Sequence, residues 1–226
     1  MKNSLHKFKI YKNGFTLAEV LITLIIVGVV AALTISPLIN TYVESSTVAK
    51  VKKGLSILGQ AKKLAEAQNG PIVTWDYPEG NSAVAVSKFW PYLRPYISFA
   101  KECGSSNDCY QTGAVTSLNG SDKSYPSTNS NYYKFILADG CVMWFRMPYT
   151  GGKCNSNEGG VDGLCALFSI DVNGNRPPNV IGRDVFLFAM AIDGVYPYMG
   201  DYCNKNSFGW SCSSYIIKHN NMNYLH

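Results

Sequence analysis

The cysteines are the residues of this sequence whose chemistry is easiest to predict. All seven lie between Cys103 and Cys212, no two of them form a C-x-x-C pair, and none of the three histidines lies among them. A zinc site usually needs close pairs of cysteine or histidine. Cysteines in loop-rich sequence without such pairs are typical of disulfides, which persist in an oxidising compartment. The sequence therefore predicts that the larger, C-terminal part of the chain is exported from the cytosol.

Local spacing suggests which cysteines pair. Three pairs would close short loops, and they are Cys103 with Cys109, Cys154 with Cys165, and Cys203 with Cys212. Cys141 would then remain as a free or intermolecular thiol. Spacing alone does not decide the connectivity, because six cysteines can be paired in many ways. Each disulfide would add about 2–4 kcal/mol by restricting the unfolded chain.

Residues able to catalyse a reaction do not come together in the sequence. It has no G-x-S-x-G nucleophile elbow and no glycine-rich phosphate loop, and its acidic residues are scattered over separate turns. The most oxygen-rich loop begins at Asp171 like an EF-hand, but Arg176 and Gly182 stand where that loop needs Gly and a bidentate Glu. We interpret it as a polar turn fixed by side-chain hydrogen bonds to the backbone. The sequence predicts a protein that is not an enzyme.

Glu19 is an acidic residue that ordinary membrane anchoring does not explain. It stands at the start of an uncharged run, residues 20–39, which as a helix would span ~30 Å, the thickness of a bilayer's hydrocarbon core. A carboxylate at full membrane depth costs about 2.5–3.5 kcal/mol and usually has a function. Lysines precede the run and cysteines follow it, which predicts a cytoplasmic N-terminus. A secretory signal peptide and a plain membrane anchor are two interpretations, and both leave Glu19 and Gly14-Phe15 unexplained.

A third interpretation comes from residues 12–22, KNGFTLAEVLI, which resemble the prepilin leader of the type IV pilin and type II secretion pseudopilin superfamily. That motif needs a Gly at the cleavage site, an aromatic residue after it, a Glu four residues further on and an uninterrupted apolar run. Gly14, Phe15 and Glu19 meet these requirements. The resemblance implies that a prepilin peptidase cuts between Gly14 and Phe15 and methylates the new amino terminus of Phe15. Residues 1–14 are then the leader peptide.

Cleavage at this position would give Glu19 a partner. The new amine on Phe15 and the carboxylate of Glu19 are both costly to leave bare in lipid, and they can neutralise each other between adjacent subunits. A subunit that moves from the membrane into a filament gains this ion pair. We therefore interpret Glu19 as an assembly residue.

The helical pattern continues beyond the apolar run. Apolar residues recur every three or four positions over residues 48–65, and Asn69-Gly70-Pro71 is a strong stop signal. One helix over residues 15–69 would have a membrane-embedded part, 20–39, and an amphipathic part, 40–69. We expect the apolar stripe of the second part to pack on the protein's own sheet. Pro37 removes one backbone donor and predicts a bend in the helix.

Residues 70–226 are expected to form an exported globular domain. The best hairpin signal is Asp139-Gly140, a two-residue turn between strands at 132–138 and 141–147, and further strands are expected at 164–171 and 184–191. Residues 87–93 suggest one short helical turn, and 103–131 an irregular loop. The predicted fold class is α+β: a long N-terminal helix packed on an antiparallel sheet of about four strands with disulfide-stapled loops. The pilin-like fold implied by the resemblance is the same.

Residues 184–194 resemble the C-terminal part of the major pseudopilins, which hold one calcium in a loop near there. The resemblance implies calcium as an optional cofactor, and the sequence requires no other. The oxygen ligands would come from Asp171, Asn173, Asp184 and Asp193.

The sequence thus predicts a structural subunit of a type IV pilus or a type II secretion pseudopilus. It would be a single-pass inner-membrane protein with a cytoplasmic N-terminus and an exported C-terminal domain, and then part of a helical filament. Its partners would be the prepilin peptidase, copies of itself and other pilins or pseudopilins, and the inner-membrane assembly platform. Four lysines before Gly14 carry most of the net charge of +5, so no nucleic-acid partner is expected. The alternative is a permanently membrane-anchored periplasmic binding or adhesin head.

Overall fold

The structure, a computed structural model, describes residues 14–109, 113–124, 126, 128–150 and 153–226. The chain divides into two compact units, Met1–Val43 and Glu44–His226. We call the second of these the head unit. The lysines before Gly14 and the rest of the predicted leader up to residue 13 lie outside the described residues.

The longest element is the helix α1, Leu17–Asn69, which runs through both units. It ends where the sequence signal predicts, because Gly70 takes a left-handed conformation (φ +80°) and its N–H still reaches the carbonyl of Glu66 at 2.9 Å. The backbone stays helical through Pro37, whose side chain is outside the described part. The bend expected at Pro37 therefore stays a prediction.

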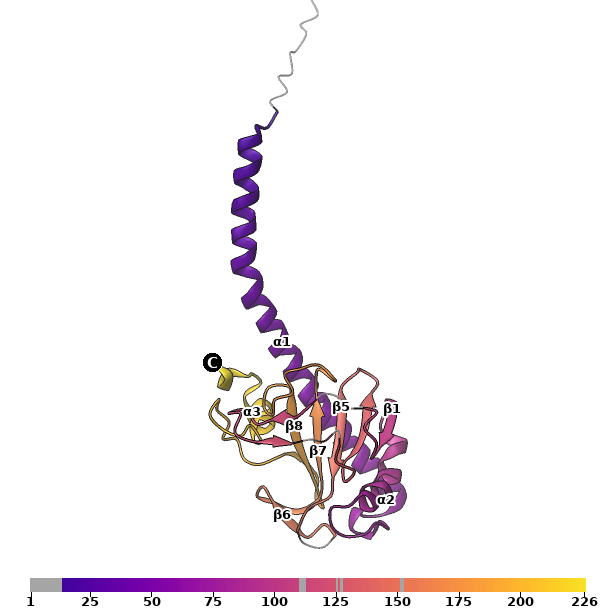
Figure 1. Cartoon of the computed structure of the whole chain (residues 1–226). Helices are drawn as coiled ribbons and strands as arrows, with labels where there is room; N and C mark the ends of the chain where they lie inside the picture. Colours follow the sequence, from indigo (N-terminus) through magenta and orange to yellow (C-terminus); the bar gives the residue numbers. More distant parts are fainter. Residues whose placement is uncertain (1–13, 110–112, 125, 127, 151–152) are drawn as a thin grey trace, which may run out of the picture. The chain divides into compact units, whose positions relative to one another are not determined.

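The C-terminal half of α1 is the helical layer of the head unit and crosses one face of its sheet (Figure 1). Val51, Leu58, Ala61 and Ala65 are fully buried there, at the spacing that marks one face of a helix. Helix and sheet come close at Gly54, where an added Cβ would lie 3.1 Å from Cδ1 of Ile170. The expectation that this stripe packs on the protein's own sheet is confirmed.

The main sheet is antiparallel, with seven strands in the order β1-β4-β5-β7-β8-β9 and with β6 paired to β7. The strands are Phe99–Gly104 (β1), Tyr133–Leu137 (β4), Val142–Arg146 (β5), Ser156–Glu158 (β6), Val161–Asp171 (β7), Val185–Ala191 (β8) and Val195–Pro197 (β9). Val115–Thr116 (β2) and Lys123–Ser124 (β3) form a separate two-stranded ladder. The four expected strands are the central ones, β4, β5, β7 and β8. The additional strands are short or partly exposed, so they carry little hydrophobic pattern.

The β4–β5 hairpin has a longer loop than the sequence suggested. The N–H of Leu137 donates to the carbonyl of Cys141 at 2.8 Å, and the N–H of Gly140 donates to the carbonyl of Leu137 at 2.9 Å. The loop therefore holds Ala138, Asp139 and Gly140, with Gly140 at φ +86°. This is the common three-residue hairpin loop with glycine in the left-handed position, rather than the two-residue turn.

Short helices surround the sheet: α2 (Ala83–Leu93), α3 (Cys212–His219) and the 3-10 turns Ile72–Thr74, Arg94–Tyr96 and Asn223–Leu225. The single helical turn expected at residues 87–93 is the end of α2, which begins further back. Its N-cap is Ser82, whose Oγ accepts from the N–H of Ala85 at 3.1 Å. Pro91 lies inside α2 and Phe89 and Trp90 join the core.

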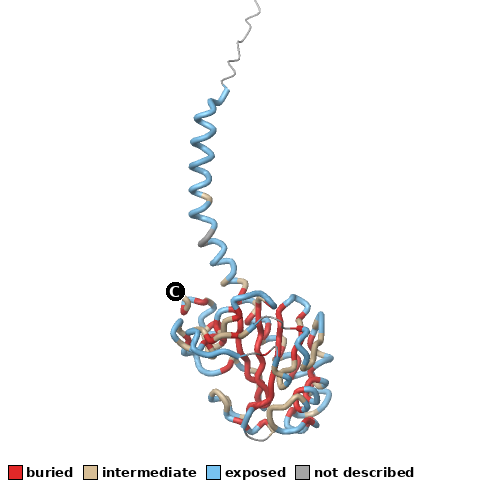
Figure 2. The backbone as a smooth tube through the Cα atoms, in the orientation of Figure 1, coloured by how far each residue is buried: buried red, intermediate tan, exposed pale blue. Residues whose placement is uncertain are grey.

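Both faces of the central strands are buried, as Figure 2 shows by the red colour along them. Phe145, Phe168 and Phe188 point toward α1 and form the centre of the main core. Alternate residues such as Trp144 and Leu187 point to the opposite face, where loops cover them in two smaller apolar clusters. The fold is α+β, with a long N-terminal helix, an antiparallel sheet and disulfide-linked loops, as predicted.

Candidate functional site at the N-terminal end of the long helix

The peptide bond between Gly14 and Phe15 is open to solvent on both sides. Phe15 is 87% exposed, and no atom lies within 4 Å of the position that a Cβ on Gly14 would take. Neither residue is part of α1, which begins at Leu17. A protease that acts on extended backbone can therefore reach this bond without unfolding any element.

Glu19 is held by Thr16 at the first turn of α1. The N–H and the Oγ1 of Thr16 both donate to Oε2 of Glu19, at 2.8 and 2.9 Å, and the N–H of Glu19 donates back to Oγ1 of Thr16 at 3.2 Å. This reciprocal pattern is a capping box, with Thr16 as the N-cap and Glu19 three residues later. It satisfies backbone donors that the first turn of a helix would otherwise leave unpaired.

The capping box fixes where the carboxylate of Glu19 lies. Within the described residues both of its bonds go to Oε2, which leaves Oε1 as an acceptor for a further donor. Neither bond involves the Gly14–Phe15 peptide, so cleavage there would leave the box intact. Thr16 was not among the predicted site residues, although the pattern T-x-x-E before an apolar run is a recognised signal.

The helix that follows is apolar on all sides. Its described side chains, residues 20–35 and 38–39, are largely exposed, for example Leu24 at 67% and Leu38 at 70%. Among the described residues α1 is the one helix that is long and apolar enough to cross a membrane. Exposed apolar surface of this extent must be covered by lipid or by other apolar helices.

Comparison with protein families matches residues 10–35 to the prokaryotic N-terminal methylation motif. The chain carries a prepilin-type signal. No curated protein and no solved structure matches the chain. The signal is that of type IV pilins and pseudopilins, so the resemblance seen in residues 12–22 is confirmed. The prepilin-type signal implies processing by a prepilin peptidase and assembly with other pilins, and with the apolar helix it fits a single-pass inner-membrane anchor.

The capping box of the prepilin-type signal can be tested with Thr16→Val, which keeps the shape of the side chain and removes its hydroxyl. The N–H of Glu19 loses its acceptor, and we expect its hydrogen exchange to become several-fold faster. Thr23→Val is the matched control, because the hydroxyl of Thr23 bonds only the carbonyl of Val20, 2.9 Å away, inside the helix. NMR of the detergent-solubilised chain measures both variants. Equal exchange at Glu19 in wild type and Thr16→Val would contradict the capping assignment.

The structure brings together three of the four residues considered as calcium ligands. The carboxylate of Asp184 accepts hydrogen bonds from the N–H groups of Asn179 and Val180 and from Nδ2 of Asn173, at 2.9, 2.5 and 2.9 Å. Oδ1 of Asp171 accepts the N–H of Asn173 at 3.1 Å. Burial raises the pKa of Asp184 above its ordinary value, against these hydrogen bonds, which favour the charged form. The carboxylates thus fix the loop between β7 and β8.

Asp193 does not join them. It follows β8 while Asp184 precedes it, so the length of a seven-residue strand separates the two, roughly 20 Å. Asp193 instead interacts with the hydroxyl of Tyr196 on β9. In the part of the chain that the structure describes, no three His, Cys, Asp or Glu side chains are grouped to hold a metal ion. The four residues do not form one site.

Six cysteines form disulfides in the head unit, paired as Cys103–Cys109, Cys154–Cys165 and Cys203–Cys212. These are the pairs that close the shortest loops. Cys141 is free and buried next to the hairpin loop. Burial, with the nearby Asp139 carboxylate, raises the pKa of Cys141 to about 12, so the thiol stays protonated and unreactive.

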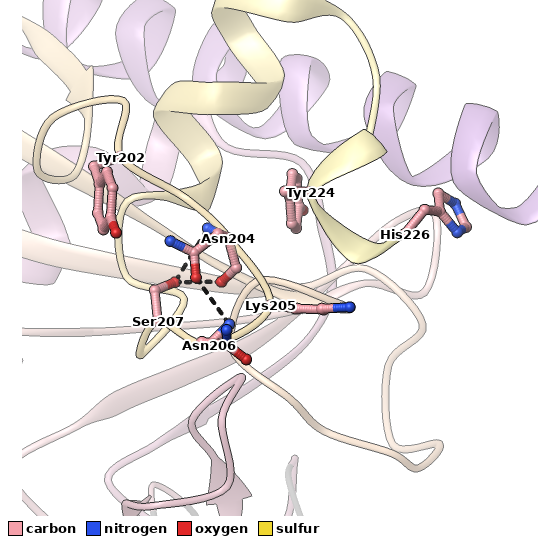
Figure 3. A pocket seen from close by; sticks show the side chains of 7 residues that line it. All are labelled: Tyr202, Asn204, Lys205, Asn206, Ser207, Tyr224 and His226. Carbon is pink, nitrogen blue, oxygen red and sulfur yellow. Dashed lines mark hydrogen bonds between the residues drawn. The ribbon is translucent and has the colours of Figure 1, made fainter.

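A hollow of about 400 Å³ lies between the loop 202–207 and the C-terminal residues Tyr224 and His226 (Figure 3). The dashed hydrogen bonds in Figure 3 join residues of the loop to each other. Asn206 N–H donates to Oδ1 of Asn204 at 2.9 Å, and Oγ of Ser207 donates to the carbonyl of Asn204 at 2.7 Å. Nε2 of His226 lies 2.9 Å from Oε1 of Glu44. These polar groups stabilise the loop and the C-terminal residues, and they do not converge on a ligand.

Proposed function

We propose that this chain is a structural subunit, made as a prepilin, of a type IV pilus or a type II secretion pseudopilus. The observation that carries the proposal is the prokaryotic N-terminal methylation motif at residues 10–35. Its expected cleavage site, Gly14-Phe15, is exposed and lies before α1. Proteins with this type of signal are structural subunits, so we expect this chain to function by assembly rather than by catalysis.

Processing begins at the bond between Gly14 and Phe15. A prepilin peptidase of the inner membrane hydrolyses it, removes the leader of residues 1–14 and leaves a free amine on Phe15. The amine then takes a methyl group from a methyl sulfonium donor: the new C–N bond replaces the donor's S–C bond, and the donor leaves as a thioether. The methylated amine keeps its positive charge and is slightly less polar. Phe15 becomes the N-terminal residue of the mature subunit, four positions before Glu19.

Assembly uses the charge pair that processing creates. The amine of Phe15 in one subunit meets Glu19 of a neighbour, and Oε1 of Glu19 is the acceptor that the capping box does not use. Pairing removes two unpaired charges from an apolar surrounding. The exposed apolar residues of α1 then pack against those of neighbouring copies in the filament core, and the head units form its surface.

The location follows from the same elements. Before assembly the chain crosses the inner membrane once through residues 20–39, with the N-terminus in the cytoplasm and the head unit in the periplasm, where its disulfides are stable. The partners are the prepilin peptidase, copies of this chain, other pilins or pseudopilins, and the inner-membrane assembly platform.

The intact mass of the chain extracted from the membranes of cells that contain a prepilin peptidase tests this proposal. We expect a species that begins at Phe15, carries one additional methyl group and lacks six hydrogens through its three disulfides. Expression in cells without the peptidase is the control and should give the chain from Met1. A chain that still begins at Met1 in the presence of the peptidase, as a permanently anchored head would, overturns the proposal.

A further inference from the structure

The head unit contains a second cavity, on the face of the sheet opposite to α1. Its floor is formed by the outward-pointing residues of β5, β7 and β8, among them Trp144, Leu167 and Leu187. Loops that carry Tyr149, Trp210 and other residues form its walls. The volume is about 460 Å³, within the range of about 300–1,000 Å³ that small-molecule sites occupy.

Aromatic rings form a large part of the lining of this cavity, together with aliphatic side chains. Five of them contribute: Tyr132, Trp144, Tyr149, Tyr198 and Trp210. The ring of Tyr198 is held in place by a close approach to Gly159, where any Cβ would lie 2.5 Å from it. Burial raises the pKa of Tyr198, so its hydroxyl stays protonated and remains a hydrogen-bond donor. Such rings offer flat apolar surfaces with polar groups at their edges.

A buried ion pair supplies the charged part of the wall. Nη2 of Arg146 lies 2.7 Å from Oε2 of Glu158, and the guanidinium stacks 4.0 Å from the ring centre of Tyr149. Nη1 of Arg146 donates to the carbonyl of Met147 at 2.9 Å, and Oε1 of Glu158 accepts the N–H of Tyr149. The Arg146 and Glu158 side chains are 9% and 15% exposed. A buried pair of this kind is weak evidence for stability, because apolar residues in its place are often as stable. Because the Arg146–Glu158 pair lies on a cavity wall, we interpret it as a group that contacts a ligand.

The charges restrict the class of ligand. Arg146 is neutralised by Glu158, and Asp122 adds a carboxylate to the lining, so the cavity does not attract anions. The ligand must therefore pack against flat apolar rings on one side of the cavity. On the other side it must form hydrogen bonds with the planar charged groups of Arg146 and Glu158. A sugar ring has both properties, since its C–H groups form an apolar face and its hydroxyls lie around the edge.

We propose that this cavity binds a neutral saccharide, as a monosaccharide or the end of a short chain. Trp210 and the other aromatic rings take the apolar face of the sugar, and the Arg146–Glu158 pair takes neighbouring hydroxyls. The binding site lies within the head unit and does not depend on cleavage or on filament assembly. An absence of sugar binding would therefore leave the proposed function unaffected, and an absence of cleavage would leave the sugar-binding proposal unaffected.

Saturation-transfer NMR on the full-length chain tests the proposal. The detergent should be zwitterionic and carry no sugar head group, because a glycoside detergent would compete for the cavity. The probes are glucose, galactose, mannose, N-acetylglucosamine and lactose at millimolar concentrations, with glucuronate as the anionic probe. We expect saturable binding of at least one neutral sugar and weaker binding of glucuronate.

Two variants test whether the sugar binds in this cavity. Trp210→Ala removes one aromatic wall and should weaken sugar binding about tenfold. Tyr202→Ala is the matched control, because Tyr202 is 77% exposed and does not line this cavity, and it should bind like wild type. Near-ultraviolet circular dichroism shows whether both variants keep the fold, and Trp210→Phe, which keeps a ring, should retain most of the binding.

Three outcomes overturn the proposal. They are no saturable binding of any neutral sugar, tighter binding of glucuronate than of all neutral sugars, and equal binding by wild type and a folded Trp210→Ala. If the cavity instead takes a side chain from a neighbouring copy, no sugar will bind, which is the first of these outcomes.

Discussion

The chain with Gly14→Val is expected to remain uncleaved and to accumulate in the inner membrane with its N-terminus at Met1. A protease that cuts after glycine can bring its groups close to a backbone without a Cβ, and a branched side chain blocks that approach. The change does not disturb the chain itself. No atom lies within 4 Å of the added Cβ, and Gly14 does not adopt a left-handed conformation. Intact mass in the presence of a prepilin peptidase measures the result.

Gly28→Val is the matched control for this experiment. Gly28 also has no atom within 4 Å of an added Cβ, and it lies inside α1, away from the cleavage site. It should be cleaved as wild type is. If Gly14→Val is cleaved as fast as Gly28→Val, the bond after Gly14 is not the one that the peptidase recognises.

The N-terminal part was predictable from sequence because its determinants are local. An apolar run of the right length, the Asn69-Gly70-Pro71 stop and the spacing of Gly14, Phe15 and Glu19 are each contained in a few consecutive residues. The four central strands could be predicted for the same reason, since each one is a short apolar run bounded by turn residues.

The rest of the head unit could not be predicted because non-local contacts decide it. Residues 103–131 looked like loop, yet Phe99–Gly104 pairs with β4 and Val115–Thr116 pairs with Lys123–Ser124. One helical turn was expected at residues 87–93, but α2 already begins at Ala83. The burial of Phe89 and Trp90 outweighs the cost of Pro91 inside it.

The candidate sites show the same division between local and non-local signals. Thr16 was readable as one half of a T-x-x-E box. Arg146 and Glu158 were not, because no sequence pattern joins residue 146 of one strand to residue 158 of another. Asp193 was grouped with Asp184 because residues 184–194 resemble the calcium-binding part of the major pseudopilins, but the seven-residue strand β8 separates the two.

Glu19→Gln tests the proposed assembly role of Glu19 separately from its role in the capping box, and it should have the largest effect on assembly. Glutamine can occupy the N3 position of a capping box as glutamate does, so the hydrogen bonds of the first turn of α1 are kept. The charge is lost, and the methylated amine of a neighbouring Phe15 is left unpaired in an apolar surrounding. Breaking a buried ion pair on one side shifts an equilibrium by roughly a hundredfold, so incorporation into filaments should fall to a trace. Immunoblots of sheared filaments and of the membrane fraction measure this.

Membrane insertion and cleavage should survive in Glu19→Gln, because the apolar run and the Gly14–Phe15 bond are unchanged. Glu44→Gln is the matched control: it removes a carboxylate from the same helix outside the apolar run, where its partner is the imidazole of His226. Glu44→Gln should assemble like wild type. Normal incorporation of Glu19→Gln would mean that the carboxylate serves only to cap the helix. Assembly would then have to depend on the apolar packing of α1 alone, without a charge pair. The free amine that cleavage creates on Phe15 would add nothing to assembly.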